Sequence, residues 1–177
     1  MLNRSSYEKC EEAAKKVIAD FQVTEPPVDI LNIVKRIGIE LVEYNLGDDT
    51  SGVLMIRNKK GTIGYNPKDA QVRRRFTVAH ELGHYLLHRT SNDLFVDNFF
   101  LMKFRGNNSY TENDHVDEQE ANAFAAAVLM PENFIDDEMK NTVYRGLTEI
   151  DFIGRLAKKF EVSIPAMTYR LTNLNIF

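Results

Sequence analysis

Two histidines one helical turn apart, with a glutamate beside the first, are the residues of this sequence best suited to chemistry. His80, Glu81 and His84 form the pattern H-E-x-x-H. On a helix the i, i+4 spacing places both imidazoles on one face, where their ring nitrogens can bind one zinc ion. Glu81 projects about 100° further round the helix, so its carboxylate can take a proton from an attacking water. The pattern therefore predicts a metal site with Glu81 as its general base.

The third metal ligand is expected on a second helix. A zinc ion that performs hydrolysis has three protein ligands and keeps its fourth position for water. No H-x-x-G-x-x-H segment follows the motif, so we expect a carboxylate, and the helix predicted from residue 116 offers Glu118 and Glu120. Glu118 and Asn122 share one face of that helix, whereas Glu120 points away from it. This favours Glu118 as the ligand, with Asn122 accepting a hydrogen bond from a ligand histidine.

The helix that carries the motif is predicted over residues 69–89. Gly83 lies between the two histidines and costs about 1 kcal/mol of helix stability relative to alanine. This cost indicates that another part of the chain approaches the backbone closely at Gly83. The apolar side chains of the helix are expected to face the core, away from the histidines: Val78, Ala79, Leu82 and Leu86.

The remaining elements predict an α+β protein with a small antiparallel sheet packed on the helix of the motif, plus a C-terminal helical pair. Alternating side chains predict the strands, which are expected at residues 39–44, 52–57 and 62–65. Helical periodicity and end signals predict the other helices. These are expected at residues 6–21, 30–37, 116–130, 132–140 and, as two helices broken near residue 161, at 147–174.

Composition excludes several classes of protein. The formal net charge of −4 argues against a general binder of nucleic acid or anionic membranes. Cys10 is the only cysteine, so the chain forms no intrachain disulfide and no thiolate zinc cluster. No segment approaches the about 18 apolar residues of a membrane span, and the first residues lack the apolar stretch of a signal peptide. We therefore expect a cytoplasmic protein that begins at residue 1.

The candidate ligands lie in two longer segments of the sequence, one after the other. Residues 75–88 read RFTVAHELGHYLLH, and residues 118–131 read EQEANAFAAAVLMP. Together these segments closely resemble the ImmA/IrrE family of metallopeptidases. The similarity covers about residues 6–135 and includes the strands near Gly52 and Tyr65.

The resemblance implies a gluzincin-like fold and a zinc-dependent endopeptidase that cleaves a helix-turn-helix repressor in a phage, mobile-element or stress-response circuit. It implies one Zn²⁺ per chain, held by His80, His84 and Glu118, with Glu81 as the catalytic acid–base. Residues 1–140 are then the metallopeptidase domain, and residues 141–177 a helix-turn-helix-like extension packed on it. The alternative is a non-proteolytic regulator, such as a toxin–antitoxin component, that keeps the metal for structure and binds protein or DNA.

The sequence leaves one role in the reaction open. The developing oxyanion needs a hydrogen-bond donor besides the metal, and spacing does not rank the candidates. These are Tyr65, Tyr85, His88, Tyr110 and His115.

The C-terminal helical pair raises the question of DNA binding. Residues 155–170 resemble a helix-turn-helix, but their basic side chains are few and Glu161 opposes them. A phosphate-binding surface usually gathers more lysine and arginine. We therefore favour a pair that packs on the core or binds a protein over one that contacts DNA. The basic residues are Arg155, Lys158, Lys159 and Arg170.

Overall fold

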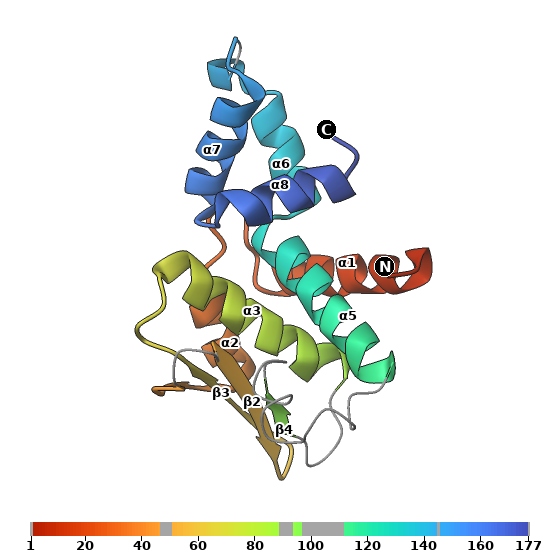
Figure 1. Ribbon diagram of the computed structural model, residues 1–177, viewed down its shortest axis with the longest axis vertical. Helices are drawn as coiled ribbons and strands as arrows, with labels where there is room; N and C mark the ends of the chain where they lie inside the picture. Colours follow the sequence, from red (N-terminus) through yellow and green to blue (C-terminus); the bar gives the residue numbers. More distant parts are fainter. Residues whose placement is uncertain (1, 47–50, 89–93, 97–111, 145, 177) are drawn as a thin grey trace.

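The computed structural model describes residues 2–46, 51–88, 94–96, 112–144 and 146–176. These residues form a mixed α+β fold, as expected, in which helices stand over one small sheet (Figure 1). The helices are α1 (Arg4–Asp20), α2 (Ile30–Ile37), α3 (Gln71–Leu87), α5 (Glu112–Leu129), α6 (Glu132–Met139), α7 (Glu149–Phe160), α8 (Ile164–Asn173) and the short 3₁₀ helix η1 (Thr142–Tyr144). The strands are β1 (Glu40–Glu43), β2 (Gly52–Arg57), β3 (Lys60–Tyr65) and β4 (Leu94–Val96).

The sheet is mixed, with the strand order β1-β3-β2-β4. β2 pairs antiparallel with β3 and β4, and the β2–β3 turn places Asn58 and Lys59 at positive φ, as a two-residue hairpin requires. β1, however, pairs parallel with β3, so the expectation of a wholly antiparallel sheet is wrong for this strand. The reason is that β2 returns the chain, and β3 then runs beside β1 in the same direction. Alternation identifies a strand but does not specify its neighbour.

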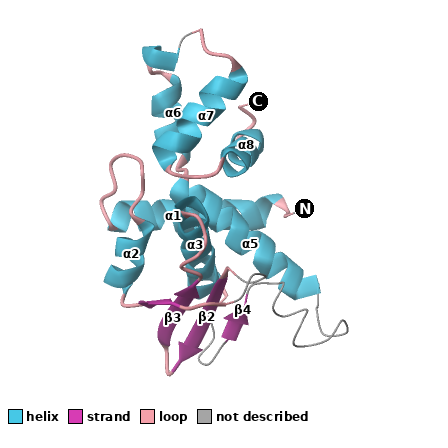
Figure 2. Cartoon of the chain, turned by 60° about the vertical axis from the view of Figure 1, so that its left-hand side comes forward, coloured by secondary structure: helices cyan, strands magenta, loops and turns pink. Residues whose placement is uncertain are grey.

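The helix of the motif lies between the sheet and the other long helices (Figure 2). Its apolar residues Val78, Ala79 and Leu82 are buried, as predicted. Leu86, in the last turn of α3, is 37 % exposed, so the expectation for this residue is wrong; Tyr85 of the same turn is buried. No helix in the described ranges has the length and apolar character needed to cross a bilayer.

Arg170 is one of the residues through which the C-terminal helices attach to the rest of the protein; Arg75 of α3, which donates to the backbone oxygens of Phe160 and Glu161, is another. The side chain of Arg170 is buried and donates hydrogen bonds to the carbonyl oxygen of Met130 at 3.0 Å and to the hydroxyl of Tyr7 at 2.9 Å. It also forms an ion pair with Glu11 of α1. Arg170 is therefore part of the core and does not present its charge to DNA. The division into residues 1–140 and 141–177 stays a prediction.

Replacing Arg170 by methionine should lower the free energy of unfolding by about 3–5 kcal/mol, because the substitution leaves the largely buried Glu11 carboxylate without its partner. Urea denaturation measures the loss. Arg155→Met, at an exposed position of α7, is the matched control and should change stability by less than about 0.5 kcal/mol. Similar stability for the two variants would show that the buried ion pair does not hold α8 in place.

Candidate metal centre

The two motif histidines project from α3 into the interior of the protein. Both side chains are buried, and their rings meet edge to face with centroids 4.7 Å apart. Their Nε2 atoms lie 3.1 Å from each other. The helical spacing therefore brings the same atom of each ring to one point.

The close crossing of α5 over α3 supplies the third group. A Cβ atom at Gly83 would lie 3.1 Å from the Cα of Ala121 and 3.2 Å from its carbonyl oxygen. The close approach expected at Gly83 is thus confirmed, and α5 is the segment that makes it. Glu118 lies one turn before Ala121 and reaches both rings: its Oε2 is 3.3 Å from His80 Nε2, and its Oε1 is 3.2 Å from His84 Nε2.

The spacing of these donor atoms suits a single metal ion. A tetrahedral ion with ligands at about 2.0–2.1 Å holds neighbouring donor atoms about 3.3 Å apart. The two Nε2 atoms, 3.1 Å apart, match this value, and each lies close to one oxygen of the Glu118 carboxylate, His80 at 3.3 Å from Oε2 and His84 at 3.2 Å from Oε1. His80, His84 and Glu118 can therefore hold one metal ion, and the fourth tetrahedral position is not taken by these residues.

The protonation states of these side chains also favour a cation. Burial lowers the pKa of His84, so its ring is neutral near pH 7 and keeps a lone pair for a metal. Burial alone would raise the pKa of Glu118, but hydrogen bonds with His80 and His84 outweigh it and lower that pKa to about 2. Neutral imidazoles and an ionised carboxylate are the forms in which these side chains bind metals.

Asn122 lies beside the ring of His80, and Glu81 follows His80 on α3. The Oδ1 of Asn122 is 3.1 Å from His80 Nδ1, where it accepts a hydrogen bond if the proton of the ring is on Nδ1. This tautomer leaves Nε2 of His80 free for a metal. Glu81 is 1 % exposed.

Gly52, the first residue of β2, gives Glu81 its space, and sequence reasoning missed this role. A Cβ at Gly52 would lie 2.8 Å from Glu81 Oε1 and 2.4 Å from Thr77 Cγ2. Only a glycine therefore fits between this strand and α3 at that point. The positional signal in the sequence is weak, because a glycine in a strand more often marks a bulge or a bend than a functional side chain nearby.

Of the candidate hydrogen-bond donors to the oxyanion, the structure places His88 next to a metal-binding residue. His88 Nδ1 lies 3.2 Å from His84 Nδ1. The hydroxyl of Tyr65 donates to Glu43 Oε1 at 3.2 Å, and His115 is exposed on α5, paired with Gln119. Tyr85 packs its ring against Gly61, and Tyr110 lies outside the described residues.

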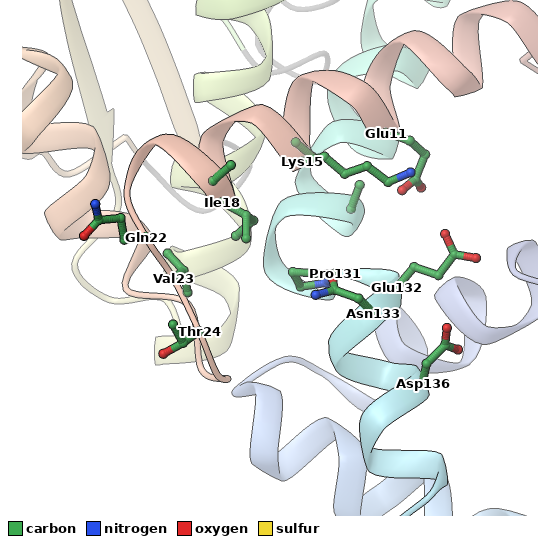
Figure 3. Close-up of a pocket in the computed structure, with 13 residues that line it drawn as sticks. Glu11, Lys15, Ile18, Gln22, Val23, Thr24, Pro131, Glu132, Asn133 and Asp136 are labelled. Atoms are coloured by element: carbon green, nitrogen blue, oxygen red, sulfur yellow. The ribbon is translucent and has the colours of Figure 1, made fainter.

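A separate groove of about 500 Å³ lies between α1 and the start of α6 (Figure 3). Ala14, Ile18 and Pro131 contribute apolar surface to it, and Glu132 and Asp136 contribute acidic groups. None of the metal-binding residues lines this groove. The candidate chemistry therefore belongs to the crossing of α3 and α5.

Substituting alanine for Gly83 should weaken metal binding, because the new methyl group would push α5, and with it Glu118, away from α3. Gly154→Ala is the matched control, since a Cβ atom at that helical glycine would meet nothing within 4 Å and the variant should gain about 1 kcal/mol of stability. Urea denaturation and competition with a zinc-binding dye measure the two effects. If Gly83→Ala and Gly154→Ala gained the same stability and bound metal with the same affinity, the close crossing of α3 and α5 would be contradicted.

The chain is similar to known proteins. A family model described as Peptidase_M78, the IrrE N-terminal-like domain, matches residues 34–172. "Uncharacterized immunity region protein 2" of Bacillus phage phi105 is 27% identical over 142 residues, which are 80% of each chain.

A solved structure of a Mycobacterium tuberculosis transcriptional regulator superposes with a TM-score of 0.60 over 93% of this chain. The identity is 18%, and this chain spans 47% of that protein, about half its length. This likeness supports a shared fold.

Proposed function

Because the chain belongs to the Peptidase_M78 family of IrrE N-terminal-like domains, we propose that it is a zinc-dependent endopeptidase that cleaves a helix-turn-helix repressor. The observation that carries the proposal is the meeting of the buried residues His80, His84 and Glu118, whose candidate ligand atoms all lie within 4.8 Å of one another. The phage relative supports the biological setting, since its name places it in an immunity region. The family resemblance supplies the class of substrate.

A zinc ion held by these three side chains would polarise the scissile carbonyl and lower the pKa of a bound water toward about 7. Glu81 accepts the proton of the attacking water and passes it to the leaving amine. Gly52 leaves the room that this carboxylate occupies. Asn122 holds the ring of His80 with Nε2 toward the other donor atoms. The charge of Glu118 balances part of the charge of a bound cation.

The test is direct. The zinc-loaded protein is incubated with the repressor encoded beside it, and new chain termini are mapped by mass spectrometry. We expect cleavage at a defined bond, its loss on addition of 1,10-phenanthroline, and its return when zinc is restored. An intact repressor after incubation with fully zinc-loaded protein would contradict the proposal.

A further inference from the structure

A line of hydrogen-bonded side chains leads from His84 to the surface of α1. His84 Nδ1 lies 3.2 Å from His88 Nδ1, and His88 Nε2 lies 3.0 Å from Glu120 Oε2. Lys9 Nζ donates to the same carboxylate oxygen at 2.8 Å. His84 is on α3 and His88 follows the last residue of that helix, whereas Glu120 is on α5 and Lys9 on α1. Three helices therefore determine the geometry of the line.

The donors and acceptors along this line follow one order when His84 binds a metal through Nε2. The proton of its neutral ring is then on Nδ1 and is donated to His88 Nδ1. His88 must therefore carry its own proton on Nε2, which it donates to Glu120. Each hydrogen bond then has one donor and one acceptor, and the carboxylate accepts from both His88 and Lys9.

Two of these side chains are buried, so water cannot easily take their place as hydrogen-bond partners. The side chain of His88 is 6 % exposed and that of Glu120 is 7 % exposed, whereas Lys9 reaches solvent. Cys10 Sγ donates to the backbone carbonyl of Glu120 at 3.4 Å, which joins α1 to α5 at the same point. Glu120 is thus held by its backbone as well as by its side chain.

We propose that His88 and Glu120 are positioning residues that orient the ring of His84 toward the metal, as Asn122 orients that of His80. The inference rests on the proposed function, because it takes His84 as a metal ligand. It also gives Glu118 and Glu120, two of the glutamates of α5, different tasks. Glu118 faces the donor atoms directly, whereas Glu120 acts on His84 through His88.

The Co²⁺-substituted full chain offers a readout for each ligand histidine. Its proton NMR spectrum should contain two solvent-exchangeable, strongly shifted N–H signals, one from His80 and one from His84. His88→Phe keeps a ring in place but removes the acceptor, so the His84 signal should shift or broaden by solvent exchange while the His80 signal stays. Asn122→Leu should have the reciprocal effect. A loss of packing alone would not select one signal in each variant.

Zinc affinity provides the second measurement. His88→Phe should lower it by about 10–100-fold, and Glu120→Gln, which keeps an acceptor oxygen but no charge, should lower it less. Lys9→Met should have the smallest effect of the three. Lys15→Met removes an exposed lysine of the same helix and should leave the affinity unchanged. Thermal unfolding of the metal-free variants checks that each one folds.

The outcomes separate this inference from the proposed function. Unchanged N–H signals and unchanged zinc affinity in folded His88→Phe would overturn the inference, even if the wild type binds zinc and cuts the repressor. Failure of the wild type to bind either Zn²⁺ or Co²⁺ would overturn both. Selective loss of the His84 signal together with the ranked losses of affinity would support the inference.

Discussion

Replacing Glu81 by glutamine should abolish cleavage of the repressor while leaving the metal site occupied. Glutamine keeps the size of the side chain but cannot accept the proton of the attacking water. General-base assistance is commonly worth about 10²–10⁴-fold in rate. Glu81 is not among the three donor groups, so its substitution removes no ligand. Thermal stability should also stay near that of the wild type, because glutamine fills the same buried space beside Gly52.

The measurement compares initial cleavage rates with zinc content for the same preparations. Glu12→Gln, which neutralises an exposed glutamate of α1, is the control and should cut at the rate of the wild type. Cleavage by Glu81→Gln at a rate close to that of the wild type would show that the mechanism is wrong. If neither form cuts any candidate repressor but both relieve repression, the non-proteolytic regulator becomes the better explanation.

Substituting alanine for Glu118 should remove the metal, and its effect should be larger than that of the same change at Glu120. The substitution deletes one of three donor groups and the only negative charge among them. Glu120→Ala is the matched control, because this residue contacts His88 and Lys9 and not the donor atoms. We expect Glu120→Ala to retain one ion per chain, with reduced affinity.

Elemental analysis after dialysis at micromolar protein concentration distinguishes the two glutamates. His80→Ala should behave like Glu118→Ala, since it deletes an equivalent donor. Full metal content in Glu118→Ala, combined with loss in Glu120→Ala, would identify Glu120 as the ligand and contradict the assignment.

Helical geometry allows the main residues of the candidate site to be predicted from the amino-acid sequence. The spacing of His80 and His84 specifies a common face, because a helix turns by about 100° per residue whatever surrounds it. The same rule distinguishes Glu118 from Glu120 without any tertiary contact. The resemblance of residues 75–88 and 118–131 to the ImmA/IrrE family is confirmed by the family match. The α+β class followed from local patterns in the same way.

Other features depended on contacts between distant parts of the chain. The parallel pairing of β1 required β3 to lie between β1 and β2. Arg170 is one of the basic residues that raise the question of DNA binding in the sequence, and packing against Glu11 and Met130 buries it. The partners of Glu120 are His88, which follows α3, and Lys9 of α1, and both contacts depend on how the helices pack.

The physical reason for this division is the range of the forces that act. Spacing, capping and alternation are set by bonds and sterics among neighbours, which the amino-acid order contains directly. The partner of a buried charge or strand edge is selected by the packing of the whole core, because each such group needs a hydrogen bond wherever the fold provides one. Periodicity shows which residues turn inward, and only the tertiary structure decides which groups they meet there.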